Sequence, residues 1–425
     1  MPGKKFILFA KDSPFGREIT AGVSSFAVLM GSLLMVPLLL SHAGVSLTGA
    51  YTATVLAALL GTLGMGLWAQ RPLVVAPNIG VNAWLIYSVV ISRGIPWQEA
   101  LGASFAAALL SVLFCFLPCC RRIFQGVPAC LMAAARGGLG LLLIFLGLRM
   151  GKLLAGSPAT ITMLGDFSEP AAFLALVGLG VTLVLLVNRQ RGAIFLGILA
   201  AAAVALLQGF MVLPDAPFFV PEGLDRTAGQ LSFAQIWQLL PVVCTLCLVQ
   251  LFDTRAVLWG LQQQDDGRLE IRACGIAAGS TLLGALLGTG PLRAAPESAA
   301  AGAAGGRSGK AALVTAGCLL LWLFCEPLAA AFLDFPAVFA PAVIAAGIWL
   351  LLDLRQPFGQ DNTEKTAALA VMLVTPLSYS LTAGLGAGFI LYTFLRLFNG
   401  QGKDIHPITY VLTALFILQY VFFEP

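Results

Sequence analysis

Charged residues are scarce in this chain. Of its 425 residues, 59% are hydrophobic and only 10% are charged, whereas a soluble domain carries about 25% charged residues. The apolar residues form runs of about 20 residues, the length that crosses the hydrocarbon of a bilayer, and short polar turns separate these runs. The pattern predicts an all-α polytopic membrane protein. The basic residues form no cluster, so we expect no nucleic-acid partner.

Histidine is also scarce, and the cysteines lack a metal-binding pattern. The only two histidines, His42 and His406, lie near the ends of predicted spans. Most of the nine cysteines lie within apolar segments, and the Cys244–Cys247 pair has no second pair to complete a zinc site. The sequence also lacks a nucleophile motif. We therefore expect no metal, no cofactor and no catalytic residue, and a protein that is not an enzyme.

The apolar runs predict fourteen membrane spans in two halves of seven. The spans are 18–41, 49–69, 73–92, 98–118, 127–148, 169–187, 191–210, 236–260, 271–288, 291–306, 309–331, 336–353, 363–381 and 382–399. A further apolar segment, 406–422, either spans the membrane or lies along its surface. The longest polar connection, Met211–Gln235, separates the halves. Because each half has an odd number of spans, the halves have opposite orientations, as in inverted-repeat transporters.

The basic residues predict the orientation of the chain. Only four of the 24 fall on one side of this topology: Arg93, Arg149, Lys152 and Arg226. Three more fall within spans: Arg136, Arg255 and Arg293. The rest fall on the other side, and the cytoplasmic side carries the excess of Lys and Arg. We predict a multi-pass protein of the plasma membrane with a cytoplasmic N-terminus; Met1–Lys11 lacks the layout of a signal peptide.

The third span of each half contains residues that an ordinary membrane helix excludes. Arg71–Trp84 carries two prolines and two asparagines, and Leu286–Ser298 carries two prolines, an arginine and a glutamate. Proline removes a backbone hydrogen bond, and a charge is costly in hydrocarbon. Irregular backbone survives at membrane depth only where it is buried in protein or lines a cavity. We therefore predict a ligand site between two matched broken helices.

The predicted substrate-binding residues are polar or lie at these breaks: Asn78, Asn82, Asp253, Thr289, Gly290, Arg293 and Glu297. Glu297 follows a proline at the first turn of the half-helix 296–306. Its carboxylate can accept ligand N–H groups beside the free backbone N–H groups of the helix end. Asp253 lies in the middle of an apolar helix, where an unpaired acid costs on the order of 2.5–3.5 kcal/mol. It must therefore face a cavity or pair with a buried arginine.

The other polar residues allow two interpretations each. The amides of Asn78 and Asn82 either hydrogen-bond a ligand or satisfy the broken backbone. Arg293 pairs with Glu297 or Asp253, or meets an anionic substrate. Arg255 lies close enough to its helix end for its side chain to snorkel to the membrane surface. For Arg136 we expect a packed structural role rather than contact with substrate.

Several motifs together resemble the xanthine/uracil permease superfamily of nucleobase–ascorbate transporters, and within it the azaguanine-resistance-type branch of hypoxanthine/guanine permeases. The resemblance covers most of the chain in order. The motifs are Glu18–Gly22, Ala76–Ala83, Trp97–Leu101, Leu251–Thr254, Gly284–Thr289, Glu297–Ala300, Gly305–Gly309 and Pro376–Ser380.

The resemblance implies a fold and a mechanism. It implies fourteen spans as a 7+7 inverted repeat, with short antiparallel strands before the half-helices of spans 3 and 10. A core domain (18–118 and 236–331) would carry substrate against a gate domain (127–210 and 336–399), and 400–425 would be a C-terminal apolar segment. It also implies a homodimer that works by elevator-like movement with proton coupling.

The same resemblance implies roles for individual residues. The family's binding acids match Asp253 and Glu297, which would also carry the coupling proton, and its span-three asparagine matches Asn82. The leading hypothesis is a proton-coupled permease for a purine-like nucleobase such as guanine or hypoxanthine.

This chain departs from the family at several positions. The usual Ser/Thr-rich strand reads Gly290–Pro296, Asn78 replaces a glycine, and Ala277 replaces an acid. Arg255 and Arg136 stand where small residues are usual. The added cations suggest a second hypothesis, transport of an oxidised purine or another small anion recognised through Arg293. A sensor that binds ligand without transporting it is a third.

Overall fold

The computed structural model describes residues 14–117, 127–157, 161–188, 193–211, 218–261, 268–333, 335–352 and 361–422, with the single residues 190, 214, 216, 354 and 359. Several basic residues that entered the prediction of orientation lie outside the described residues: Lys4, Lys5, Lys11, Arg121, Arg122, Arg189, Arg191 and Arg355. The side of the membrane that holds the N-terminus therefore stays a prediction.

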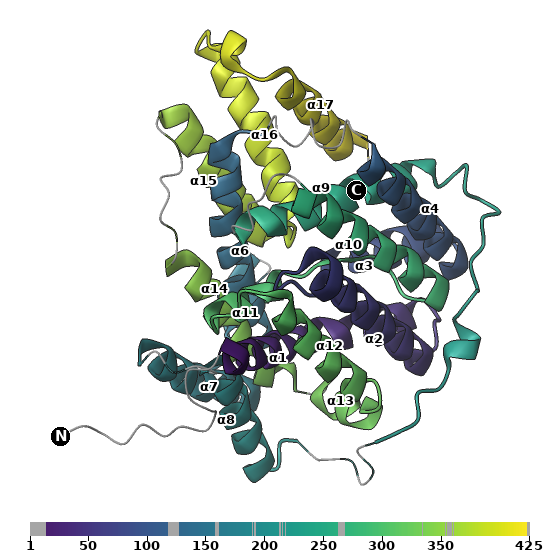
Figure 1. The fold of residues 1–425 in the computed structure, drawn as a ribbon, viewed down its shortest axis with the longest axis vertical. Helices are drawn as coiled ribbons and strands as arrows, with labels where there is room; N and C mark the ends of the chain where they lie inside the picture. Colours follow the sequence, from purple (N-terminus) through teal and green to yellow (C-terminus); the bar gives the residue numbers. More distant parts are fainter. Residues whose placement is uncertain are drawn as a thin grey trace.

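Helices make up most of the described chain (Figure 1). In the first half they are α1 (Pro14–His42), α2 (Leu47–Gly64), η1 (Met65–Ala69), α3 (Ile79–Trp84), η2 (Leu85–Ile91), α4 (Trp97–Phe116), α6 (Ala129–Met150), α7 (Pro170–Val187) and α8 (Ala193–Leu207). After η3 (Leu224–Arg226) come α9 (Leu240–Gly260), α10 (Arg268–Leu287), η4 (Pro296–Ser298), α11 (Ala299–Ala303), α12 (Gly309–Trp322), α13 (Glu326–Leu333), η5 (Pro336–Phe339), α14 (Ala340–Leu352), α15 (Asn362–Ser378), α16 (Leu381–Phe398), η6 (Gly402–Asp404) and α17 (Pro407–Phe422).

The helices follow the predicted apolar runs closely. Among the described residues, eight helices are long and apolar enough to cross a membrane: α1, α2 with η1, α4, α6, α7, α9, α10 and α16. Shorter apolar helices occupy other predicted spans, including α3 with η2, α8 and α14. The chain is therefore a multi-pass membrane protein. Among these eight helices, the largest shifts in boundary are at α1, which begins at Pro14 rather than 18, and at α9, which begins at Leu240 rather than 236.

The predicted span 309–331 is not one straight helix. The structure divides it into α12 and α13, which meet at an angle of 99°. Pro327 is the second residue of α13, and proline begins a helix more readily than it continues one. At the bend, the Trp322 carbonyl accepts from Cys325 N at 2.9 Å and from the Tyr51 hydroxyl at 2.6 Å.

Two groups of helices pack among themselves. Helix α6 packs on α14 and α15, and α15 packs on α16, whereas α10 packs on α4 and α2, and α1 on α12. Figure 1 shows α6, α14 and α15 along one side of the molecule and α2, α4 and α10 along the other. Small residues allow the close approach: a Cβ on Gly347 of α14 would lie 2.5 Å from the Gly140 carbonyl oxygen of α6. Such contacts are typical of membrane helices.

The two predicted breaks form one antiparallel strand pair. Strand β1 (Val75–Pro77) precedes α3, strand β4 (Leu292–Ala294) precedes η4 and α11, and the register pairs Ala76 with Arg293. The expectation of short antiparallel strands before these half-helices is confirmed. A second pair, β2 (Leu154–Ser157) with β3 (Ile161–Leu164), forms a hairpin after α6.

Polar side chains from surrounding helices satisfy the outer edges of this pair. Thr281 of α10 accepts from Leu292 N at 2.9 Å and donates to Leu292 O at 2.8 Å. Gln250 of α9 also donates to Leu292 O, at 2.7 Å. On the other strand, Thr62 of α2 accepts from Val75 N at 3.0 Å. Since hydrocarbon offers no hydrogen-bond partners, these side chains allow non-helical backbone inside the protein.

Gly290 tests how tightly the two broken spans pack at their crossing, the place where β1 pairs with β4. A Cβ on Gly290 would overlap Asn82 Oδ1. We expect Gly290→Ala to lower the melting temperature of the purified protein, at a cost of about 1–3 kcal/mol for overpacking. Gly279→Ala is the matched control, since its Cβ would enter open space on α10 and alanine favours a helix by about 0.8–1.0 kcal/mol. The control should melt at or above the wild-type temperature. Equal melting of both variants and wild type would show that the crossing is not tightly packed.

Candidate functional site

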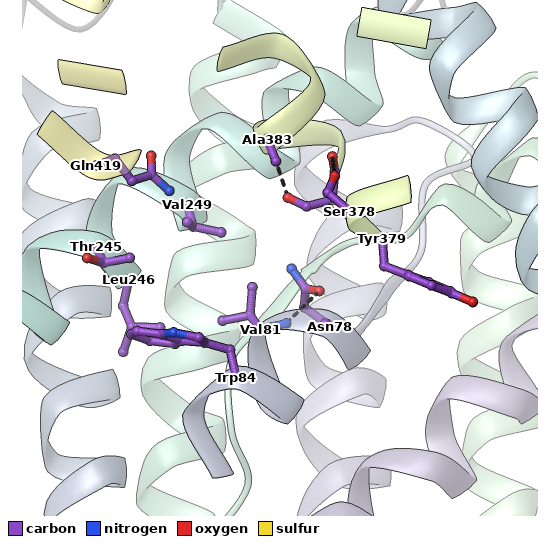
Figure 2. A pocket seen from close by; sticks show the side chains of 12 residues that line it. Asn78, Val81, Trp84, Thr245, Leu246, Val249, Ser378, Tyr379, Ala383 and Gln419 are labelled. Carbon is purple, nitrogen blue, oxygen red and sulfur yellow. Dashed lines mark hydrogen bonds between the residues drawn. The ribbon is translucent and has the colours of Figure 1, made fainter. Parts of the chain in front are cut away.

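A pocket of about 290 Å³ lies where the break in the third span meets α9, α16 and α17. Its volume is close to the lower end of small-molecule pockets, about 300–1,000 Å³. Figure 2 shows the side chains around it. The lining residues are Asn78, Gly80, Val81, Trp84, Thr245, Leu246, Val249, Ser378, Tyr379, Ser380, Ala383 and Gln419. The pocket therefore has the volume of a site for a small molecule, and its lining includes aromatic and polar residues.

Asn78 connects the pocket to the buried acid behind it. It is the N-cap of α3, and its Oδ1 accepts from Val81 N at 3.4 Å. Its Nδ2 donates to Asp253 Oδ2 at 2.5 Å. Asn78 thus caps the half-helix and holds Asp253 at once. Of the predicted site residues, it is the one that lines the pocket.

Asp253 is the centre of a buried polar cluster. Its side chain is 2% exposed, and Arg293 donates to its Oδ2 at 2.7 Å. Thr382, at the start of α16, donates to its Oδ1 at 3.2 Å. With Asn78, these groups surround the carboxylate with donors from three different elements. Arg293 therefore pairs with Asp253 rather than Glu297, which decides between two of the pairings that the sequence left open.

Glu297 differs from Asp253 in its surroundings. It lies in η4, directly after Pro296, and is 6% exposed. Its Oε2 has no hydrogen-bond partner within the described part of the chain. Burying an unpaired polar atom is costly, so a ligand N–H or a proton would stabilise Glu297 in this position. The two predicted acids therefore offer different chemistry: one is satisfied by the protein, and the other has an oxygen available.

The remaining predicted ligand residues lie behind the pocket wall. Asn82 is fully buried, and its Nδ2 donates to Asn78 O at 2.7 Å and Pro291 O at 3.0 Å. This matches the second interpretation of Asn82, that its amide satisfies the broken backbone. Thr289 exchanges a 2.7 Å hydrogen bond with Thr54 of α2. Gly290 packs against Asn82. A role for these residues in ligand contact stays a prediction.

Two of the three arginines predicted within spans, Arg255 and Arg136, are buried away from the pocket lining. The expectation that the Arg255 side chain snorkels to the membrane surface is wrong. Arg255 is 5% exposed and forms an ion pair with Glu270. Its Cζ lies 5.2 Å from the ring centroid of Trp259. Glu270, in the first turn of α10, supplies the buried counter-charge. Arg136 has the expected packed role, with its Nε donating to Leu350 O at 3.4 Å.

Sequence reasoning missed the wall formed by α16 and α17. Helix α15 ends at Ser378, and Tyr379 takes a left-handed conformation, with φ of 52°, that turns the chain into α16. Ser380 then caps α16 by accepting from Ala383 N at 3.2 Å. The motif Pro376–Ser380 was a usable signal for this turn. Gln419 gave no such signal, because it is one polar residue in an apolar segment of undecided placement.

The Asp253–Arg293 pair yields a stability prediction. Arg293→Ala leaves a buried carboxylate without its cation, and breaking a buried pair costs about 3–5 kcal/mol. We expect a clear drop in melting temperature, partly restored in the double variant with Asp253→Asn. Lys152→Ala is the control, because its ion pair with Glu169 is exposed and such pairs contribute about 0–1 kcal/mol. Strictly additive effects of the two core substitutions would contradict the pairing.

Comparison with known proteins identifies the family. A family model described as "Permease family", that of the xanthine/uracil permeases, matches residues 16–374. The guanine/hypoxanthine permease PbuO of Bacillus subtilis (strain 168) is 32% identical, covering 97% of this chain and 99% of the relative. The guanine/hypoxanthine permease PbuG of the same organism is 31% identical over 96% and 97%. The adenine permease AdeP of Escherichia coli (strain K12) is 28% identical over 96% and 93%.

Solved structures share the fold at low sequence identity. The transmembrane domain of a cyanobacterium bicarbonate transporter, BicA, aligns with a TM-score of 0.55 at 16% identity, covering 89% of this chain and 98% of that one. SLC26A9 aligns with a TM-score of 0.53 at 12% identity, over 90% and 65%. The family match confirms the expectation of a transporter rather than an enzyme. The chain belongs to the xanthine/uracil permease family, as its motifs indicated.

Proposed function

We propose that this permease transports a purine-like nucleobase, and that it does so by proton-coupled secondary transport. The observation that carries the proposal is the pocket at the N-terminus of α3, which joins two aromatic side chains to a set of uncharged polar groups. The printed substrates of its relatives, guanine with hypoxanthine and adenine, support the same class.

The pocket walls match the chemistry of a purine. Trp84 offers an aromatic face against which a planar base can stack, whereas the Tyr379 ring packs on Phe145, with the ring centroids 5.5 Å apart. Gly80 lies in the first turn of α3, where backbone N–H groups have no partner within the helix. These groups can donate to a carbonyl oxygen of the base. Thr245 and Ser378 add hydroxyl groups around the edge.

The charge balance favours a neutral base over an anion. The lining residues that the structure describes include no lysine or arginine. The Arg293 guanidinium, on which the anionic alternative depends, already pairs with Asp253. An anion would have to break that buried pair to reach it, and the carboxylate would then lose its cation. The neutral purine remains the better fit.

Proton coupling is proposed to run through the two buried acids. Asp253 is held by donors from β4, α3 and α16, whereas Glu297 has an unsatisfied oxygen. Either a proton or an N–H group of the base can bind that oxygen. A site that releases the proton when it binds the base would link transport to the proton gradient. The hydrogen bond from Thr382 to Asp253 would have to break when the two helix groups move.

Alternating access would move a core against a gate. We propose the core as 18–118 with 236–331 and the gate as 127–210 with 336–399, arranged as fourteen spans in a 7+7 inverted repeat. Helices α1, α2, α10 and α12 pack mainly on one another, as do α6, α14, α15 and α16, which supports this division. We further propose a homodimer in the plasma membrane with a cytoplasmic N-terminus.

Uptake by purified protein in liposomes tests the acids. We expect Glu297→Gln and Asp253→Asn each to lower hypoxanthine uptake driven by a pH gradient at least about tenfold, since the first removes the carboxylate proposed to take the proton and the second weakens the charge-assisted bonds from Arg293 and Asn78. Glu169→Gln serves as the control, because the Glu169 side chain is 40% exposed and pairs with the exposed Lys152. All three variants must still melt cooperatively above the assay temperature, because Asp253→Asn also breaks the pair with Arg293. Wild-type uptake in both acid variants would contradict the assignment.

Competition experiments separate the neutral substrate from the anionic alternative. Unlabelled hypoxanthine, guanine or adenine should displace labelled hypoxanthine at least about tenfold more effectively than urate does. Urate is an anion at neutral pH, and the described lining residues include no lysine or arginine to pair with it. Stronger displacement by urate, lost in Arg293→Ala, would instead establish an anion carrier.

A further inference from the structure

The C-terminal helix α17 returns to the boundary between the two helix groups. The Tyr420 hydroxyl donates to Ala383 O of α16 at 2.6 Å, and Thr413 exchanges a 2.8 Å hydrogen bond with Thr393. The Phe416 ring lies 5.2 Å from that of Phe252, the residue before Asp253 in α9. These contacts fix α17 against both α16 and α9. The apolar segment 406–422 is therefore packed beside the pocket.

Gln419 is the polar residue that α17 places in the pocket. Its side chain is 8% exposed and belongs to the pocket lining. Its Oε1 has no hydrogen-bond partner in the part of the chain that the structure describes. Figure 2 shows its carboxamide beyond Val249, on the far side of the pocket from Asn78 and Tyr379. A buried amide with an unused acceptor is stabilised when a ligand supplies the partner.

We propose that Gln419 binds the transported base directly and determines which bases are accepted. This inference rests on the proposed function, because it takes a nucleobase as the ligand. A carboxamide presents an acceptor and a donor side by side. It therefore complements a heterocycle edge with an adjacent N–H and C=O, or N–H₂ and ring nitrogen, as glutamine does with adenine. Stacking on Trp84 leaves this edge of the base free to meet Gln419.

The test compares Gln419→Leu with wild type in the full-length purified protein. Leucine keeps most of the side-chain volume and removes both the donor and the acceptor. We expect Kd for labelled hypoxanthine to rise about tenfold, while the melting temperature without ligand stays equal or rises because the unpaired amide is gone. Gln419→Glu keeps an acceptor and loses the donor, so we expect it to change the order of preference among hypoxanthine, guanine and adenine.

Leu418→Ala is the matched control, since Leu418 precedes Gln419 on the same helix and its side chain is 47% exposed. Its Kd and its order of preference should equal those of wild type. Unchanged Kd and order in both Gln419 variants, with binding by wild type, would overturn this inference alone. A wild-type protein that binds none of the three bases would overturn the proposed function, and this inference with it.

Discussion

The hydrogen bonds between β1 and β4 are the constraint on which the rest of the structure depends. Lipid offers no partner to a free N–H or C=O group, so a broken span persists only if protein groups satisfy its backbone. Here the backbone groups of each broken span hydrogen-bond those of the other. Asn78 N, for example, donates to Pro291 O. Thr281 and Gln250 complete the outer edge at Leu292. The crossing thereby brings Asn78 at the start of α3 and Arg293 in β4 to the same buried acid.

Asp253 connects this crossing to helix α16. Its carboxylate binds Arg293 on one strand and Asn78 at the start of α3, and it also binds Thr382 on α16. Asp253 therefore contacts a residue of the pocket lining, the buried cation and the neighbouring helix group at once. In the proposed transport cycle, this carboxylate is where ligand binding would be coupled to movement of the helix groups. Glu297, with its available oxygen, provides the complementary group.

Properties that depend on local sequence could be predicted, and properties that depend on tertiary partners could not. Proline and charge inside an apolar run located both breaks, because such residues exclude an ordinary membrane helix wherever they occur. The partner of Arg293 required knowing that β4 lies beside α9. Arg255 was misjudged because its counter-charge, Glu270, lies on another helix, α10, and their contact depends on how α9 and α10 pack. The 99° bend before α13 had a signal in Pro327, whereas the position of Gln419 depends wholly on how α17 packs.

The most direct measurement is an experimental structure of the protein in lipid nanodiscs with hypoxanthine bound. The account predicts density for the base in the pocket between Asn78, Val249 and Tyr379, with the ring stacked on an aromatic wall and its polar edge within hydrogen-bond distance of the α3 N-terminus. The Asp253–Arg293 pair should remain intact. Density for the base elsewhere, or a base held directly by Arg293 with the pair broken, would contradict the central claim.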